Sequence, residues 1–120
     1  MDNFNSNNKV EISRDVINAI IKKAVLETEG VAGINDTGKS IINTISKKSK
    51  GINFTIKDNK IKTVVDITVY YGCKINETAA AVQNNVAEKI EAMTGMECVG
   101  VNVEVTDIII NENSEISEGE

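Results

Sequence analysis

The chain has 120 residues, enough for one domain with its own core, and 41% of them are hydrophobic. It has only two phenylalanines and two tyrosines, so the core must be aliphatic. It has no histidine, which removes the usual general base near neutral pH, the histidine-activated nucleophiles and the commonest metal ligand. The net charge of −5 comes from the two ends of the chain.

The first part of the chain predicts a polar tail, a short strand and a long helix. Residues 1–8 are asparagine-rich and are expected to be disordered, without the apolar stretch of a signal peptide. Lys9–Ser13 alternates like a strand, with Val10 and Ile12 facing inward. Ser13 then stands where a helix N-cap is expected, and Gly30 where the helix should have ended. Between them runs one apolar stripe made of Val16, Ile17, Ile20, Ile21, Ala24 and Val25.

The middle of the chain predicts a hairpin after a stretch with a weaker signal. Residues 35–38 have turn chemistry, and residues 40–46 are compatible with a short helix. From Ile52 the apolar residues alternate, which predicts a strand. Asp58-Asn59 is the expected turn, leading into a second strand that ends near Tyr71.

The last third predicts a helix and a final strand. Asn76 is the expected N-cap and Gly95 the residue just past the helix. An inward stripe follows helical spacing: Ala79, Val82, Val86, Ile90 and Met93. Val101, Val103 and Val105 then alternate as a strand, and residues 111–120 are expected to form a disordered acidic tail.

This order predicts an α+β fold, a small β-α-β-β-α-β single domain over residues 9–110, with two long helices packed on a mixed sheet.

One motif favours a different function. Gly33 to Ser40 has the spacing G-x-x-x-x-G-K-S of a phosphate-binding P-loop, with Asp66 as a candidate metal-holding acid. A P-loop must follow a buried parallel strand, however, and only Val31-Ala32 separates Gly33 from the helix end. The hairpin at Asp58-Asn59 also indicates antiparallel pairing. We therefore prefer to interpret Gly33 to Ser40 as a surface loop. Nucleotide binding by this segment remains the alternative function.

The remaining candidate groups indicate no reaction. Cys73 follows a strand-ending glycine and is a conceivable reactive thiol, but a small residue in a turn explains it better. Cys98 is expected to be buried, and both thiols are expected to be reduced. Two pairs of acidic residues, Glu27 with Glu29 and Glu88 with Glu91, are interpreted as solvent-exposed. Nucleic-acid binding is not expected because aromatic residues are so few. No run of about 18 apolar residues is present, so membrane insertion is not expected. We predict no cofactor, no metal and no catalytic residues.

Charge is the feature that indicates an interaction surface. The stretch 39–62 carries seven lysines against one aspartate, and the stretch 76–110 carries six acidic residues against one lysine. Such asymmetry can dock copies head to tail or bind a charged surface, although either stretch alone is also compatible with an ordinary solvated face. The predicted surface consists of Lys39, Lys47, Lys48, Lys50, Lys62, Glu88 and Glu91.

Taken in order, these pieces resemble the alkaline shock protein family of Gram-positive bacteria, also called the envelope stress response family. The N-terminal matches are Val10-Glu11-Ile12-Ser13, Asp15-Val16-Ile17 and Glu29-Gly30-Val31-Ala32-Gly33. The C-terminal matches are Tyr71-Gly72, Ile75, Gln83, Val86, Met93-Thr94-Gly95 and Val101-Asn102-Val103-Glu104-Val105. The resemblance extends over essentially residues 9–109.

The resemblance implies a small cytoplasmic protein without catalytic activity, which acts as a structural or adaptor protein in cell-envelope homeostasis and stress. It further implies self-association, and location at the inner face of the membrane through a membrane-anchored partner. The very short tails of this chain put in doubt any partner binding that depends on the longer extensions of other family members.

Overall fold

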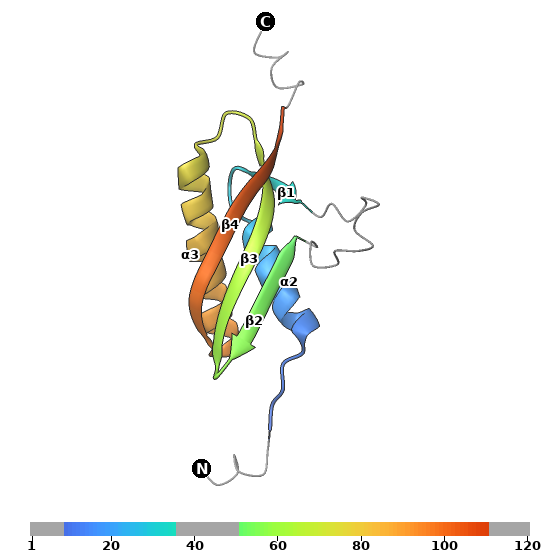
Figure 1. Cartoon of the computed structure of the whole chain (residues 1–120), viewed down its shortest axis with the longest axis vertical. Helices are drawn as coiled ribbons and strands as arrows, with labels where there is room; N and C mark the ends of the chain where they lie inside the picture. The colour runs from blue at the N-terminus through green and yellow to red at the C-terminus, as the bar shows by residue number, and fades with distance from the viewer. Residues whose placement is uncertain (1–8, 36–50, 111–120) are drawn as a thin grey trace, which may run out of the picture.

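The computed structural model describes residues 9–35 and 51–110. They form, in chain order, the helix α2 (Arg14–Leu26), the strands β1 (Val31–Ile34), β2 (Ile52–Lys57) and β3 (Lys60–Tyr70), the helix α3 (Ile75–Thr94) and the strand β4 (Glu97–Ile109). The predicted α+β class, with two long helices on a mixed sheet, is confirmed (Figure 1). None of the described helices is long and apolar enough to cross a bilayer.

The strand β3 lies in the middle of the sheet. Along one edge it pairs antiparallel with β2 over its first half and with β1 near its end. Along the other edge it pairs parallel with β4 over its full length. The chain passes from β3 to β4 through α3, so these three elements form the crossover that parallel strands require.

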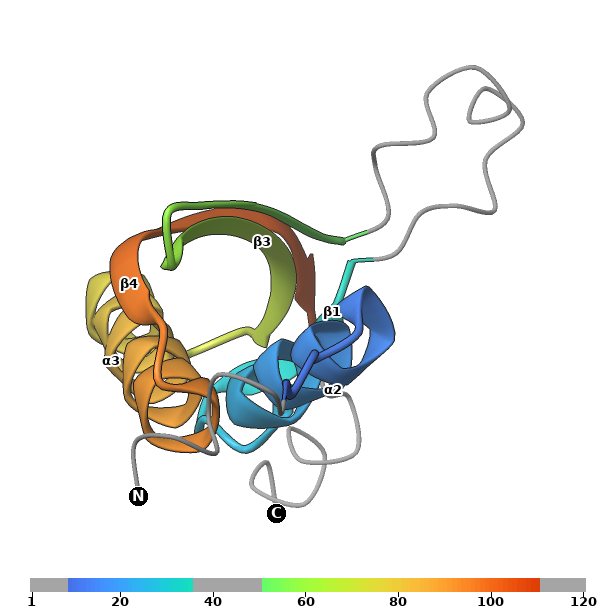
Figure 2. The same cartoon turned by 90° about the horizontal axis from the view of Figure 1, so that it is seen from below.

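Both helices pack on the same face of the sheet, so the domain has two layers (Figure 2). The core between the layers is aliphatic, as predicted, with Phe54 as its one aromatic member. From β3 it receives Ile61, Val65, Ile67 and Val69, all fully buried. Each such side chain contributes roughly 1.5–3 kcal/mol by leaving water.

The apolar stripes of the two helices are confirmed except at Val16 in α2 and Met93 in α3, and Ala79 at the start of the α3 stripe is only half-buried. Val16 is 48% exposed because it lies about 100° round the helix from Ile17, at the margin of the buried stripe. Met93 is 64% exposed because it lies in the last turn of α3. Met96, after the turn at Gly95, is buried in the core instead.

The predicted helix ends are partly confirmed. Ser13 caps α2 by accepting the N–H of Val16, and Gly95 ends α3 with a left-handed φ of 80°. Asn76 is not the N-cap of α3, because a turn after β3, closed by the bond from Cys73 N–H to Tyr70 O, starts the helix earlier. Lys74 occupies the cap position and makes no side-chain cap bond.

The strand predicted at Lys9–Ser13 is wrong. These residues form no strand, and Val10 is 88% exposed. Two apolar residues offer too little buried surface to hold a strand. The strand β1 was missed at Val31–Ile34 because four residues containing a glycine give almost no periodic signal.

The hairpin between β2 and β3 is confirmed. Asp58 and Asn59 form its two-residue turn with φ of 53° and 63°, the geometry that Asn and Asp tolerate best among residues with side chains. The turn at 36–38, the short helix at 40–46 and the terminal segments 1–8 and 111–120 lie outside the described residues.

We predict that Gly30→Ala destabilises the domain more than Gly72→Ala. Both glycines have a left-handed φ, of 96° and 102°, which costs an alanine roughly 1–2 kcal/mol. Only at Gly30 would the new Cβ lie 2.7 Å from Thr78 Oγ1, which adds roughly 1–3 kcal/mol of overpacking. Urea unfolding of both variants measures the difference, and equal losses would contradict the tight packing of Gly30 on α3.

Candidate interaction surface

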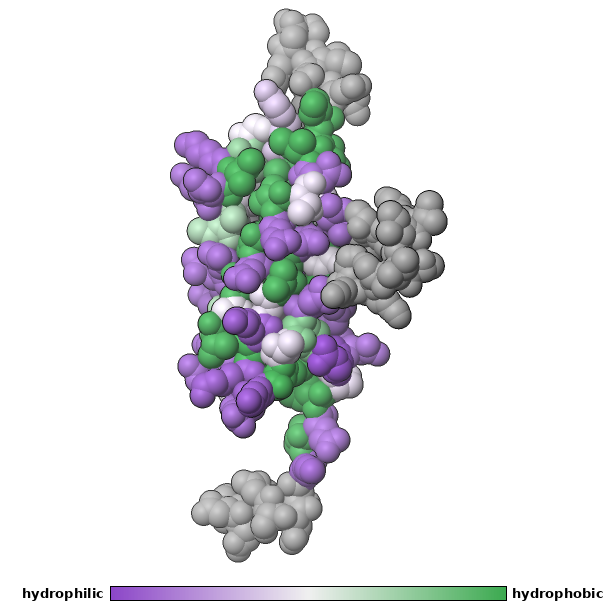
Figure 3. Space-filling model, in the orientation of Figure 1, coloured by the Kyte–Doolittle hydropathy of each residue, from purple (hydrophilic) through white to green (hydrophobic). Residues whose placement is uncertain are grey.

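The face of the sheet opposite the helices is covered by no element among the described residues, and it is the face seen in Figure 3. Its charge changes along β3. The hairpin end carries Lys57, Lys60 and Lys62, and the middle carries Asp66 and Glu104. The far end is apolar, with Tyr70 and its register partner Ile109 both 44% exposed.

The acidic middle of this face contains two carboxylates side by side. Asp66 on β3 lies opposite Glu104 on β4 in the parallel register, and when one of the two carboxyl groups is protonated it can donate a hydrogen bond to the other. Burial, then this hydrogen bond and the charge of Glu104, raise the pKa of the Asp66 carboxyl above its ordinary value of 3.8. Like charges directly opposite on neighbouring strands repel, so this pair is a strained feature of the surface.

The backbone of β4 shows which edge of the sheet is free. Asp66 N–H bonds to Gly51 O, so the backbone N–H and C=O groups of even-numbered β3 residues point toward β2. The backbone groups of odd-numbered β3 residues therefore point toward β4. In a parallel pair, each odd-numbered β3 residue bonds to the two β4 residues that flank its register partner. The β4 residues that bond to β3 are therefore Gly100, Asn102 and Glu104. The backbone groups of the residues between them, Val101, Val103 and Val105, point to the free edge.

Side chains close the free edge of β4 at both ends. From α3, Gln83 Nε2 donates to Val101 O at 3.1 Å, and Glu91 Oε2 accepts Cys98 N–H at 3.0 Å. At the other end, Asp107 Oδ1 accepts the N–H of its neighbour Ile108 at 2.8 Å. Between these closures lies a stretch from Val103 to Thr106, which we call the open window. No described residue bonds its edge-facing backbone groups.

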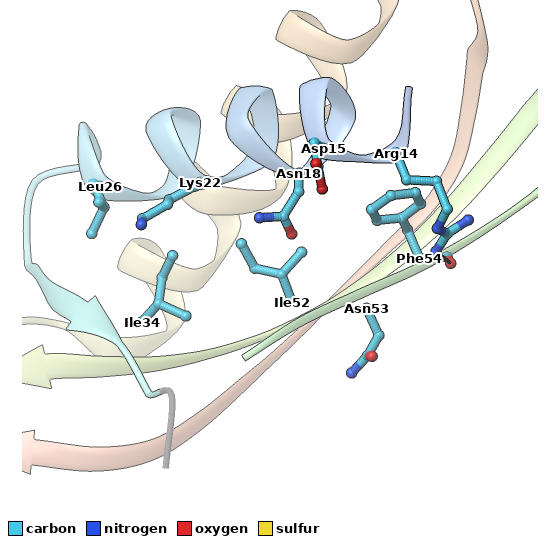
Figure 4. A pocket seen from close by; sticks show the side chains of 9 residues that line it. All are labelled: Arg14, Asp15, Asn18, Lys22, Leu26, Ile34, Ile52, Asn53 and Phe54. Carbon is cyan, nitrogen blue, oxygen red and sulfur yellow. Dashed lines mark hydrogen bonds between the residues drawn. The ribbon is translucent and has the colours of Figure 1, made fainter. Parts of the chain in front are cut away.

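A groove of about 570 Å³ lies between α2 and the strands β1 and β2 (Figure 4). Its floor includes Ile34 and Ile52, and its rim includes Asn18 and Lys22. The Arg14 guanidinium stacks 4.1 Å from the centre of the Phe54 ring and donates to Phe54 O at 3.1 Å. Arg14 thereby blocks the outer edge of β2, and the groove brings together no set of groups suited to catalysis.

Of the predicted surface residues, three lie in the described structure and do not gather in one place. Lys62 is exposed on the open face of the sheet, and Glu88 is exposed on α3, in the other layer. Glu91 holds the start of β4, so it has a structural task besides its charge. Lys39, Lys47, Lys48 and Lys50 lie outside the described residues.

The first glycine of the P-loop motif does not lie where a P-loop requires it. Gly33 lies within β1 and is registered with Thr68 in an antiparallel pair, whereas a P-loop begins after a parallel strand. Asp66 faces Glu104 in mid-strand. Residues 36–40 of the motif lie outside the described residues.

The two cysteines are free and lie at opposite ends of α3, which a helix of 20 residues separates by roughly 30 Å. Cys73 is half-buried rather than fully exposed, and Cys98, predicted to be buried, is also only half-buried. Burial raises the pKa of the Cys98 thiol, with a smaller contribution from Glu91 in the same direction. Within residues 9–35 and 51–110, no three potential metal-binding side chains gather.

Sequence reasoning missed the acidic pair and the open window. Asp66 and Glu104 are 38 positions apart, and only the parallel register brings them together. The available signal was the absence of lysine, arginine and proline from β4, since exposed edge strands usually carry such residues.

Comparison with known proteins matches residues 2–110 of the chain to the model of the alkaline shock protein 23 family, described as having a cell envelope-related function. The protein YqhY of Bacillus subtilis strain 168, itself described as uncharacterized, is 29% identical over 103 residues, covering 83% of this chain and 76% of YqhY. A protein of Streptococcus pyogenes serotype M1 named stress response regulator gls24 homolog is 26% identical over 105 residues. That match covers 83% of this chain and 58% of the streptococcal relative.

Solved structures of the MamM CTD have a similar fold. A nickel form superposes with a TM-score of 0.56 at 17% identity, covering 78% of this chain and 96% of that one. A manganese form superposes with a TM-score of 0.57 at 16% identity, covering 79% and 99%. At these identities the likeness concerns the fold alone.

We predict that Asp66→Asn stabilises the chain at neutral pH and not in acid. Because the folded pKa of Asp66 is raised, the folded chain holds this proton more tightly than the unfolded chain does. Protonated Asp66 therefore contributes to folding stability at low pH, and this contribution is lost as pH rises through the folded pKa. Asparagine removes the repulsion, which is worth up to about 1 kcal/mol at pH 7 and vanishes below about pH 4.

Urea unfolding of the wild type and of Asp66→Asn from pH 3 to pH 8 measures this difference. Glu29→Gln, a neutralisation in the exposed turn after α2, is the control and should show no such trend. A constant difference between Asp66→Asn and the wild type across the range would show that the two carboxylates do not repel.

Proposed function

The chain belongs to the alkaline shock protein 23 family, which has a cell envelope-related function, and on this premise we propose that it is a non-enzymatic structural or adaptor protein. It acts in cell-envelope homeostasis and stress by self-association and by docking a partner. The stress response regulator name of its streptococcal relatives supports the stress role. Location at the inner face of the membrane, through a membrane-anchored partner, is part of the same proposal.

The observation that carries self-association is the separation of opposite charges between the two layers. Lys62 is exposed on the open face of the sheet, within the lysine-rich stretch of the chain. Glu88 is exposed on α3, whose buried stripe of Val82, Val86 and Ile90 faces the other way. One copy can therefore set the basic hairpin end of its sheet face against the acidic helix face of the next copy.

A contact between two different faces has consequences for the kind of assembly. It is heterologous, so it closes into a ring or continues as an open chain of copies, rather than stopping at a two-fold dimer. It is made by exposed charges, so salt screens it over about 10 Å at 0.1 M ionic strength. Both consequences suit a protein whose assembly responds to the surrounding conditions.

We predict that the chain self-associates at low salt and that single charge reversals weaken this association. In Lys62→Glu and in Glu88→Lys each contact joins two like charges, so either variant should shift sedimentation velocity profiles toward the monomer. The double variant Lys62→Glu/Glu88→Lys restores opposite charges on the two faces and should recover association. Sedimentation at about 0.05 and 0.5 M salt provides the comparison.

A strict monomer at low salt would overturn self-association. Association that is insensitive to salt and to the charge reversals would overturn the charge-based contact. Circular dichroism of each variant serves as the control for folding, which these exposed positions should leave unchanged.

A further inference from the structure

We infer that the open window of β4, from Val103 to Thr106, is a strand-addition site for an extended, lysine-bearing segment of a partner protein. This site lies at the sheet edge, apart from the two faces through which we propose that copies associate. The site specifies the chemistry of the docked partner, and this inference about the partner rests on the proposed adaptor function.

The first support is the state of the backbone in the window. The N–H and C=O groups of Val103 and Val105 point away from β3 and meet no partner among the described residues. An added strand would satisfy these groups in one register, and each such bond contributes roughly 0.5–1.5 kcal/mol net. Recognition of an extended peptide by an exposed sheet edge works through main-chain bonds of this kind.

The second support is the way α3 treats the same edge. Gln83 and Glu91 reach the edge of β4 and close it at Val101 and Cys98. One turn before Gln83, where a side chain of the same helix face would reach the window, the sequence has Ala79 and Ala80. Alanine has no polar group to offer, so the helix that closes part of the edge leaves the window open.

The third support is charge. Glu104 stands in the window, Asp66 lies beside it and Asp107 follows it, while β4 contains no lysine or arginine. An added strand with lysines at alternate positions would set one beside Glu104, where a cross-strand pair of opposite charge contributes roughly 0.2–1 kcal/mol, and Asp66, one strand farther in, adds a longer-range attraction. Its other side chains would face Ala80, which is exposed on α3, so apolar residues suit those positions.

The same charges disfavour a second copy of this chain as the occupant. The β4 strand of another copy would bring Glu104 and Asp107 against the same carboxylates, and like charges opposite each other destabilise a strand pair. The β2 strand of another copy has its outer edge blocked at Phe54 O by Arg14. A basic segment from a different protein meets neither obstacle.

Fluorescence anisotropy with the full chain, kept dilute enough to be monomeric, tests this site. The probe is a labelled peptide that alternates lysine and valine over seven residues. The comparison peptides are the same sequence with glutamate in place of lysine, and the lysine peptide with methylated backbone nitrogens at alternate residues. Methylation removes the donors that strand addition needs and keeps the charge, without altering the protein.

We expect the lysine peptide to bind, and the glutamate and methylated peptides to bind at least about tenfold more weakly. Glu104→Lys should reduce binding of the lysine peptide at least about tenfold, because it replaces an attraction by a repulsion. This variant should keep its fold, since it also sets an opposite charge beside Asp66. The control Glu29→Lys makes the same charge change in the α2–β1 turn and should alter affinity less than about twofold.

Equal binding of the methylated and unmodified lysine peptides would overturn strand addition in favour of general charge attraction. Equal losses in Glu104→Lys and Glu29→Lys would overturn the location. Absence of binding to the lysine peptide up to millimolar concentration would overturn the proposal altogether. Protection of the Val103 amide from exchange in concentrated protein without peptide would assign the edge to a second copy. Each result is independent of the salt-dependent self-association proposed above.

Discussion

The rest of the structure depends on the pairing of β3 along both of its edges. One edge holds β1 and β2 and the other holds β4, so every strand of the described domain is attached through this one. Its core-facing side chains, from Ile61 to Val69, are also the floor on which both helices pack. Because β3 and β4 are parallel, the chain must cross over between them, and this requirement places α3 beside the outer edge of β4.

That placement explains why the free edge of the sheet is only partly closed. A long edge strand without lysine, arginine or proline is exposed to pairing with other chains. In this domain, Gln83 and Glu91 on α3 provide the closure that β4 itself lacks, and they provide it only as far as Val101. The acidic pair Asp66 and Glu104 lies beside the part left open, so the unpaired backbone and the negative charge occur together.

Local patterns predicted the elements whose signals are local. The alternation through β3, the turn at Asp58-Asn59, the serine cap of α2 and the glycine after α3 each need only a few neighbouring residues, and each was confirmed. The stretch at Lys9–Ser13 alternates as well, but Val10 is 88% and Ile12 38% exposed, so its two apolar residues bury too little surface to hold a strand. The candidate site was not predictable in the same way. The register that sets Asp66 beside Glu104, and the reach of Gln83 to Val101, arise only when segments far apart in sequence pack together.

Amide hydrogen exchange of the dilute chain, followed residue by residue by NMR, tests the open edge most directly. If β4 is paired on one side only, the amides of Asn102 and Glu104, which bond to β3, should exchange slowly. The amides of Val103 and Val105, which face the free edge, should exchange fast. Uniform protection along β4, or slow exchange at Val103 and Val105 in the monomer, would show that the edge is already closed and would contradict this account.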